Sequence, residues 1–387
     1  MGDLVENVVA GATPKTSVKE YWDGGDIPWL SSGEVHKKFV YFTDKFITSE
    51  GYNNTSTKLV PKNSVLIALA GQGKTRGTVA INKIELCTNQ SIASIIPNNN
   101  LYYKFLFYYL ESKYEYLRAL SSSDGGRGGL NLKLIRSIPI KIPLIDEQKA
   151  ISEFINLIDK KISILKRKYE SYEDFKKYLM QQIFAQKLRF KSDDNKDFED
   201  WKERKLSEFL TEHKLKSTGK EEVYSVSVHK GLVNQVEHLG RAFSAPDTSK
   251  YNLVKPGDIV YTKSPTGDFP LGIIKQSRVE KNVIVSPLYG VFTPETFDLG
   301  YILNDYFESN VNTHNYLHPI VQKGAKNTMN ITNKTFLSKS LVVPTDKNEQ
   351  HKIASFLMKI NKSINLIEIQ RDNVENFKKG LLQQMFV

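Results

Sequence analysis

The amino-acid sequence predicts an α+β protein built from two similar halves, each a globular domain followed by one long helix. Three observations predict this. Residues 147–184 and 349–386 align without a gap at a constant offset of 202 and share 15 identical positions. Both segments carry apolar residues at alternating steps of four and three, which is typical of a coiled-coil seam. Shorter matches precede both copies in the same order, so the whole half is repeated.

The composition is that of a globular protein with a basic balance. The 387 residues are 40% hydrophobic, and the formal net charge is +11, for which nucleic acid is the natural partner. The alternative is a merely basic protein. The longest purely apolar run, Val65–Ala70, is too short to cross a bilayer. The single cysteine, Cys87, excludes a disulfide framework within one chain, and a reducing cytoplasm fits.

Each repeated segment predicts a helix of about 38 residues, roughly 57 Å long at 1.5 Å per residue. Lys176 interrupts the first seam and Lys378 the second, at the same offset. A strand-like run that ends in proline precedes each helix, at 138–143 and 341–344. The lysines of the first helix are expected to form mostly a solvated face. These are Lys160, Lys161, Lys166, Lys168, Lys176 and Lys177.

The fainter matches divide the rest of each half. Residues 59–66 resemble 253–260, each a turn followed by a buried strand, and residues 109–112 resemble 306–309 in short helices. The predicted domains are 1–142 and 206–344, with helices over 143–186 and 345–387. Residues 187–205 form an exposed, charged linker anchored by Phe190, Phe198 and Trp201.

The motif that most resembles an active site is Ala68–Thr75, which ends like a phosphate-binding loop. Its first required glycine is replaced by Ala68, and residues 76–81 predict a turn and a strand instead of a helix. A loop that meets DNA phosphates or bases is the better interpretation. His314 and His318 have the spacing of helical zinc ligands without a third ligand, and Cys87 is expected to be buried. No convincing catalytic centre is predicted.

Glycine, basic and amide residues gather in two further loops. Residues 125–129 surround Arg127 with glycines, and residues 323–328 carry two lysines at the matching place. Asn131 and Asn330 follow these loops and are predicted to occupy equivalent positions. A flexible surface loop is the competing interpretation for any single residue.

Together these features resemble the specificity subunit of type I restriction-modification systems. The resemblance rests on Glu147-Gln148 and the helix end 179–184, repeated as Glu349-Gln350 and 381–386. The segment 27–34 resembles the opening of a target recognition domain, and 71–75 resembles the glycine-lysine loop of the family. Residues 187–206 resemble the leader that precedes each such domain, which is missing before the first half.

The resemblance implies two target recognition domains in pseudo-two-fold repeat, joined by two long antiparallel helices that form a coiled-coil spacer. Each domain would read one half of a split DNA site, asymmetric because the two halves differ. The chain would have no catalysis and no cofactor of its own, and would act in the cytoplasm of a bacterium or archaeon. Two modification subunits using S-adenosylmethionine, and restriction subunits using ATP and Mg, would assemble on it.

The predicted DNA contacts are polar residues of the loops. For the first half-site they are Ser31, Ser32, Gln72, Lys74, Thr75, Arg76, Arg127 and Asn131. For the second they are Ser227, His229, Lys230, Lys263, Ser264, Lys323, Lys326 and Asn327. Two rival hypotheses are a DNA methyltransferase or nuclease with its own recognition domains, and a coiled-coil adaptor that binds only protein. The first would need a cofactor loop or an acidic metal cluster.

Overall fold

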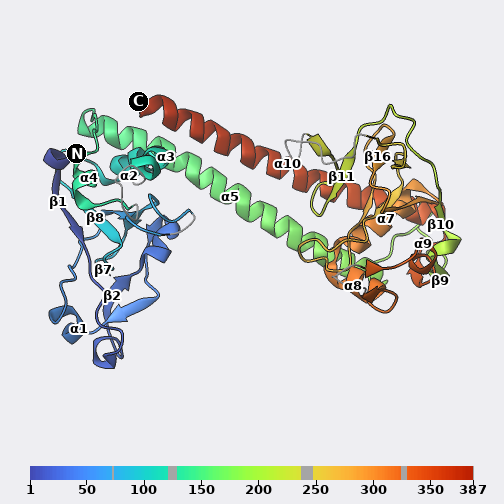
Figure 1. Cartoon of the computed structure of the whole chain (residues 1–387), viewed down its shortest axis with the longest axis horizontal. Helices are drawn as coiled ribbons and strands as arrows, with labels where there is room; N and C mark the ends of the chain where they lie inside the picture. Colours follow the sequence, from blue (N-terminus) through green and yellow to red (C-terminus); the bar gives the residue numbers. More distant parts are fainter. Residues whose placement is uncertain (72–73, 121–128, 237–246, 324–328, 387) are drawn as a thin grey trace. The chain divides into compact units, whose positions relative to one another are not determined.

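The computed structural model describes residues 1–71, 74–120, 129–236, 247–323 and 329–386 (Figure 1). The chain forms two compact units. The first unit comprises Met1–Arg167 with Glu368–Val387, and the second comprises Lys168–Ile367. Each unit thus contains a globular domain with parts of both long helices. Strands and helices are mixed in both, so the α+β prediction is confirmed.

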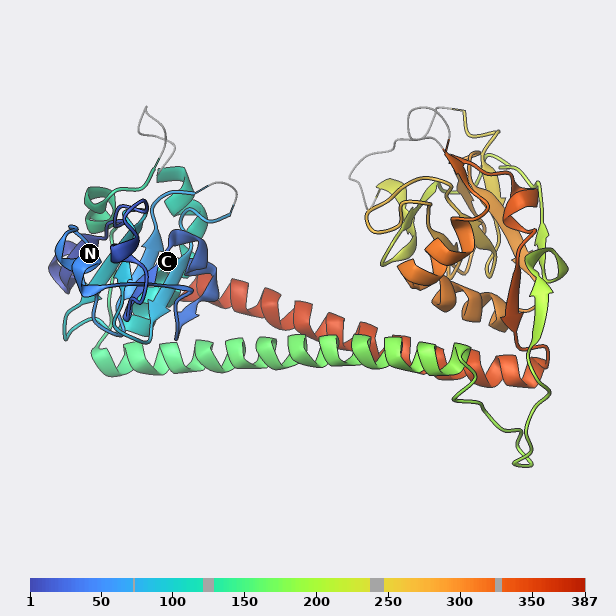
Figure 2. The same cartoon turned by 90° about the horizontal axis from the view of Figure 1, so that it is seen from below.

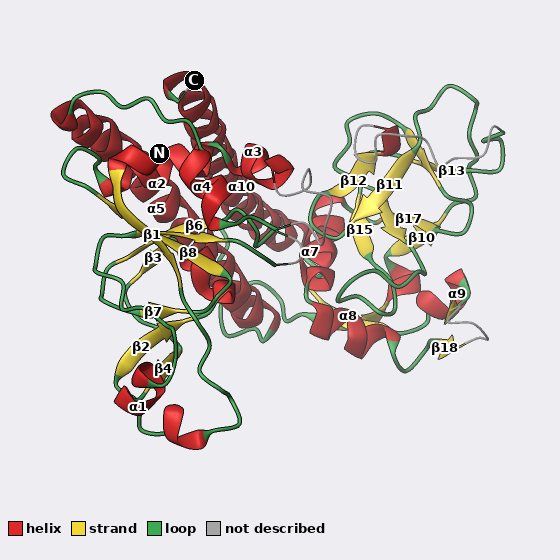
Figure 3. Ribbon diagram, turned by 60° about the vertical axis from the view of Figure 1, so that its left-hand side comes forward, coloured by secondary structure: helices red, strands yellow, loops and turns green. Residues whose placement is uncertain are grey.

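The domain of the first unit is built on a five-stranded sheet. Its strands run in the order β1 (Val5–Ala10), β8 (Ile92–Pro97), β5 (Val65–Ala68), β6 (Val79–Asn82) and β3 (Phe39–Val40). All neighbours are antiparallel except β6 and β3. A smaller sheet has the order β4 (Lys45–Ile47), β2 (Ile27–Leu30) and β7 (Cys87–Thr88). Both sheets are yellow in Figure 3.

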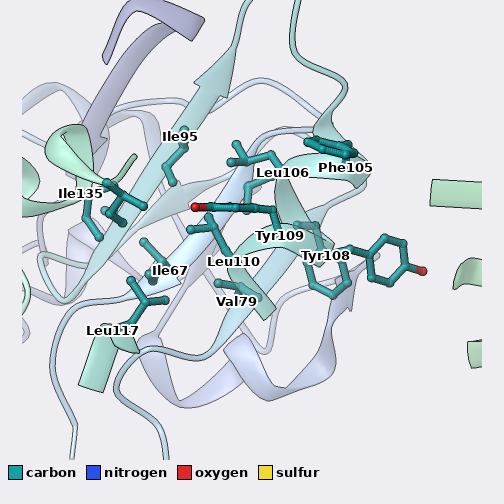
Figure 4. Packing of buried hydrophobic residues seen from close by; sticks show 14 of the residues in the cluster. Ile67, Val79, Ile95, Phe105, Leu106, Tyr108, Tyr109, Leu110, Leu117 and Ile135 are labelled. Carbon is teal, nitrogen blue, oxygen red and sulfur yellow. The ribbon is translucent and has the colours of Figure 1, made fainter. Parts of the chain in front are cut away.

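Short helices connect these strands. The 3-10 helices are η1 (Gly2–Leu4), η2 (Lys19–Tyr21) and η3 (Ser32–Lys37), and the α-helices are α1 (Ser49–Asn53), α2 (Tyr103–Ser112), α3 (Tyr114–Leu120) and α4 (Leu132–Ser137). Helix α2 fills the core, since every residue from Phe105 to Leu110 is buried. In Figure 4 its side chains meet Ile67, Val79 and Ile95 of the sheet. Tyr108 and Tyr109 point their hydroxyls in opposite directions.

The second unit repeats this strand order. Its main sheet runs β10 (Leu210–Glu212), β17 (Gly290–Pro294), β14 (Ile259–Tyr261) and β15 (Ile274–Gln276). The remaining pairs are β11 (Tyr224–Ser227) with β12 (Gly231–Asn234), β13 (Asn252–Val254) with β16 (Val283–Val285), and β18 (Gln322–Lys323) with β19 (Met329–Asn330). Its helices are η4 (Leu206–Glu208), α7 (Phe297–Glu308), α8 (Asn310–Leu317) and α9 (Asn333–Phe336).

One turn shows how closely the two backbones correspond. Asn63 and Gly257 stand at matching places before β5 and β14, and both have positive φ, +67° and +88°. The amide of Asn63 donates to Asn82 O (2.8 Å) and that of Gly257 to Ser277 O (2.9 Å). Asparagine and glycine are the residues that tolerate this conformation. The predicted turn-and-strand match of 59–66 with 253–260 is therefore confirmed.

The two long helices are α5 (Ile145–Phe184) and α10 (Lys347–Met385), drawn as continuous helices in Figure 2. Each begins against its own half of the chain through a buried glutamine. Gln148 Nε2 donates to Pro143 O (2.9 Å), and its Oε1 accepts from Tyr102 N (2.8 Å). Gln350 Nε2 likewise donates to Pro344 O (2.9 Å). The repeated Glu-Gln motif therefore fixes the start of each helix.

Each helix ends against the domain of the other half. Phe184 at the end of α5 packs on Tyr306 of α7, with ring centroids 4.8 Å apart. Phe386 packs in the same way on Tyr109 of α2, at 5.8 Å. Within the second unit, Leu179 of α5 also clusters with Ile360 and Ile364 of α10. The apolar seam is thus used in packing, as the periodicity predicts.

The expectation of a mostly solvated lysine face is confirmed, because five of the six lysines are exposed. Lys176 is the exception: its side chain is only 12% exposed and donates to Glu308 Oε2 at 2.5 Å. Lys378, at the matching position, donates to Glu111 Oε2 and Asp159 Oδ1, both at 2.7 Å. A lysine in a packed seam must find a carboxylate, because an unpaired buried charge is strongly unfavourable. Both polar interruptions of the seam are therefore ion-paired docking residues.

Of the two predicted strand-like runs, the second forms a strand and the first does not. Residues 341–343 lie in β20 (Ser340–Val343), which pairs with β9 (Lys202–Lys205), the end of the charged linker. Residues 138–143 lie outside any strand, because no segment equivalent to β9 pairs with them in the described part of the first unit. In the linker, Trp201 and Phe190 pack with α10 residues, and Phe198 is half-buried.

Candidate nucleic-acid interface

The glycine-lysine loop is the hairpin turn between β5 and β6. Gly77 N donates to Ala68 O (2.9 Å) and Ala68 N to Thr78 O (3.0 Å), so the hairpin closes at its base. Gly77 has φ +83°, a conformation that favours glycine. A phosphate-binding loop would lead into a helix, but β6 follows here. The rejection of that motif is therefore confirmed.

A tyrosine that sequence reasoning missed holds this loop in place. Tyr114, the first residue of α3, donates its hydroxyl to Lys74 O (2.9 Å), and Arg118 Nη1 donates to the Tyr114 hydroxyl (2.9 Å). Thr78 Oγ1 also donates to Lys74 O (2.9 Å). The backbone at Lys74 is thus anchored while its side chain is exposed. Thr75 and Arg76 beside it are half-buried.

The loop forms one wall of an open hollow of about 960 Å³ with mixed charge. Its basic lining comes from His36 and Lys38 around η3, from Lys74, and from Arg118. Glu111 and Glu115 are the acidic residues, and Glu111 is bound by Lys38 at 2.5 Å. Lys38 is paired with Glu111, and among the other basic residues Lys74 and His36 are exposed whereas Arg118 is half-buried.

Ser31 has a structural task. It is the N-cap of η3, and its amide and hydroxyl both lie 3.1 Å from Glu34 Oε2. Glu34 is buried and also binds Lys37 Nζ (2.9 Å). Ser32 is the half-buried first residue of η3. The pattern Ser31-x-x-Glu34 is a capping box, a signal visible in the sequence.

Asn131 also caps a helix, although it is exposed. Its Oδ1 accepts from Leu134 N at the start of α4 (2.9 Å). The preceding Leu130 N donates to Leu69 O (3.0 Å), which places this segment beside the glycine-lysine loop. The equivalent cap of α9 is Thr332, whose hydroxyl accepts from Thr335 N. The predicted equivalence with Asn330 is wrong, because Asn330 lies in β19, two residues before that cap.

In the second unit the predicted residues fall on two hairpin turns. Exposed His229 and Lys230 stand between β11 and β12, and Ser227 Oγ accepts from Lys230 N (3.3 Å). Lys263 and Ser264 stand between β14 and β15, the counterpart of the glycine-lysine loop. Burial lowers the pKa of Lys263, and Glu212 partly opposes this effect. Ser264 Oγ donates to Thr262 O (3.3 Å).

The other predicted contacts lie outside the described residues. These are Gln72, Arg127, Lys326 and Asn327, together with the side chain of Lys323.

The described residues hold no group of three His, Cys, Asp or Glu side chains able to bind a metal ion. The rings of His314 and His318 lie 4.9 Å apart on and after α8. Cys87 is buried in β7, and this burial raises the pKa of its thiol. Over the described part of the chain, no helix is long and apolar enough to cross a membrane.

Known proteins are similar to this chain in sequence. Residues 1–173 match the family described as the type I restriction modification DNA specificity domain. The EcoR124I/EcoR124II specificity subunit of Escherichia coli is 28% identical over 177 residues, which is 42% of this chain and 44% of that protein. The MjaIX specificity subunit of Methanocaldococcus jannaschii is 28% identical over 250 residues, 61% of this chain and 56% of that protein. The chain thus spans about half the length of these relatives.

Two further comparisons extend beyond residue 173. The MjaVIII specificity subunit of Methanocaldococcus jannaschii is 25% identical over 98% of this chain and 88% of that protein. The crystal structure of the S subunit of a type I restriction-modification system from M. genitalium superposes with a TM-score of 0.58 and 14% identity, covering all of this chain and 94% of that chain. The fold of a type I specificity subunit is therefore present across both units.

Proposed function

We propose that this chain is the sequence-specific DNA-binding subunit of a type I restriction-modification complex. It reads a split, asymmetric site with two target recognition domains, 1–142 and 206–344. The observation that carries the proposal is the same hairpin in both domains, between β5 and β6 and between β14 and β15, with unlike basic loops. Two domains with the same backbone hairpin but different loop residues are suited to reading two half-sites of different sequence.

The two long helices, over 143–186 and 345–387, serve as the spacer between the domains in this proposal, and 187–205 as the linker. At 1.5 Å per residue, the 40 residues of α5 extend roughly 60 Å, longer than one DNA turn of about 34 Å. The half-sites are therefore separated by base pairs that the domains leave untouched.

The chain itself has no catalytic role and no cofactor. It recruits two modification subunits, which supply S-adenosylmethionine chemistry, and restriction subunits, which use ATP and Mg. We place the complex in the cytoplasm of a bacterium or archaeon. Methyl transfer by the isolated chain with DNA and S-adenosylmethionine would overturn the non-catalytic role.

DNA contact by the glycine-lysine loop is tested with two lysines at opposite ends of β5. Lys74 lies in the loop and Lys62 lies before the strand, and both are exposed. Binding of duplex DNA is measured for K74M and K62M at several salt concentrations. A lost phosphate contact lowers the salt slope by about 1. K74M should do so and K62M should leave it unchanged; equal behaviour would refute this assignment.

The split asymmetric site is tested by sequencing the methylome of cells that express the chain with its modification subunits. The expected motif has two unlike parts separated by unspecified bases. A continuous or palindromic motif would contradict the division of reading between the two domains.

A further inference from the structure

Each domain is docked on the long helices through the same pair of partly buried charges. In the first unit, Lys378 of α10 lies 2.7 Å from Glu111 of α2. In the second unit, Lys176 of α5 lies 2.5 Å from Glu308 of α7. A second lysine from the domain joins each glutamate: Lys38 at 2.5 Å from Glu111, and Lys275 at 2.9 Å from Glu308.

A second carboxylate completes each cluster, but it comes from opposite sides of the docking surface. In the first unit it is Asp159 of helix α5, 2.7 Å from Lys378. The domain offers Tyr108, whose ring lies 5.3 Å from Lys378 Nζ. In the second unit the domain offers the carboxylate, Asp305 of α7.

The helix of the second unit carries an amide at the equivalent place. Asn361 of α10 corresponds to Asp159 at the 202-residue offset, and its Nδ2 donates to Asp305 Oδ2 (3.0 Å). Asp305 also lies 3.7 Å from Lys176 Nζ. The second carboxylate thus belongs to the helix in the first unit and to the domain in the second unit. In the second unit the helix residue that faces it is a neutral amide.

In the second unit Lys176, Lys275 and the more exposed Arg278 face the two carboxylates of Glu308 and Asp305. Burial opposes ionisation of Glu308, but Lys275 and Lys176 outweigh it and lower its pKa to about 2. Burial raises the pKa of Asp305, Glu308 adds to this rise, and Lys176 and Arg278 oppose it. A third carboxylate at the junction would repel Asp305 in a site with little water to screen it.

We propose that the second carboxylate is a pairing code between domain and helix, so that each domain fits the helix pair that carries the complementary residue. A domain with tyrosine requires aspartate on the helix, and a domain with aspartate requires asparagine. The code concerns how the domains dock and stands independently of what their loops read. It makes Asp159 and Asn361 positioning residues.

The test is an isosteric exchange in the second unit of the full-length chain. N361D adds the third carboxylate, D305N removes one, and D305N/N361D moves the carboxylate to the helix as in the first unit. The matched control is N365D, one turn along α10 at an exposed position. Hydrogen exchange of α7 amides reports local docking, and α2 amides of the first unit serve as internal reference.

We expect N361D to speed exchange of α7 about tenfold or more, since each pKa unit of repulsion is a factor of ten in the opening equilibrium. The double variant should recover most of this loss, and N365D should change exchange less than twofold. Additive losses in the double variant, or an N361D effect no larger than that of N365D, would overturn the proposal.

A second measurement separates repulsion from altered packing. The ionisable and charged groups around the added carboxylate are Asp305, Glu308, Tyr301, Lys176, Lys275 and Arg278. Repulsion requires both carboxylates to be ionised, and the pKa of Asp305 is raised. The decrease in the urea midpoint caused by N361D should therefore become smaller as the pH falls from about 7.5 to about 4. A decrease that is the same at both pH values would indicate packing and would refute the code.

Discussion

Adjacent lysines on α5 allow a sharp test of the docking pair. Lys176 and Lys177 differ in their surroundings: the first is 12% exposed and binds Glu308, and the second is 70% exposed and binds Asp174 at 3.4 Å. Replacing either by methionine keeps a long apolar stem and removes the charge. K176M leaves Glu308 with one lysine partner and Asp305 without its α5 partner, whereas K177M loses only a surface pair.

The magnitude follows from burial. Removing one partner of a fully buried ion pair costs about 3–5 kcal/mol. Glu308 is 30% exposed and keeps Lys275, so we reduce the expected cost of K176M to about 2 kcal/mol. K177M should cost less than about 0.5 kcal/mol, as exposed helix pairs do. K378M, at the matching position with two 2.7 Å contacts, should cost at least as much as K176M.

Equilibrium urea unfolding measures the difference. With an m-value of roughly 2–3 kcal/mol/M for a unit of this size, 2 kcal/mol moves the midpoint by roughly 0.7–1 M. Hydrogen exchange then assigns the loss to the second unit for K176M and to the first for K378M. A K176M midpoint indistinguishable from that of K177M would refute the reasoning from burial.

Three further outcomes are expected. The neighbouring lysines depress the pKa of Glu308 to about 2. Its ionised form therefore stabilises the fold above about pH 4.5, and this contribution is lost as the pH falls towards 2. The melting temperature of E308Q should accordingly fall less over this pH range than that of the unchanged protein. Y114F removes the hydroxyl that donates to Lys74 O, so DNA binding should weaken by up to about tenfold, as for one hydrogen bond, whereas Y116F on the exposed side of α3 should not. Gly257→Ala places a side chain at φ +88° and 3.0 Å from Phe297, and a cost of about 1–2 kcal/mol should appear as a lower melting temperature.

The parts of the fold predictable from sequence depend on local rules. The seam periodicity predicts both long helices because buried positions on a helix recur every three to four residues. The turn at Asn63 and Gly257 is predictable because few residues adopt positive φ. The run at 138–143 failed as a strand because a strand depends on a partner, and that partner is distant in sequence for 341–343 and lacking for 138–143 in the described first unit.

The docking contacts could not be predicted in the same way. Lys378 meets Glu111 across 267 residues of sequence, and no local pattern reports such a distance. A signal was nevertheless present: Lys176 and Lys378 match at the helix offset, and Glu111 and Glu308 match within the helices before them. Tyr114 gave no signal, because its bond to the carbonyl of Lys74 depends on the placement of α3 beside a loop 40 residues earlier.

The residues that carry the family resemblance mostly build the frame. Gln148 and Gln350 fix the helix starts, and Phe184 and Phe386 fix their ends. The glutamines bind a proline carbonyl and the phenylalanines pack on a tyrosine in both halves, so the same residue types recur at these positions. The loops after β5 and β14 have no such requirement: the first is held by Tyr114, whereas Lys263 in the second is half-buried near Glu212. The repeated motifs therefore build the common frame, while the loops after β5 and β14 are held by different contacts in the two units.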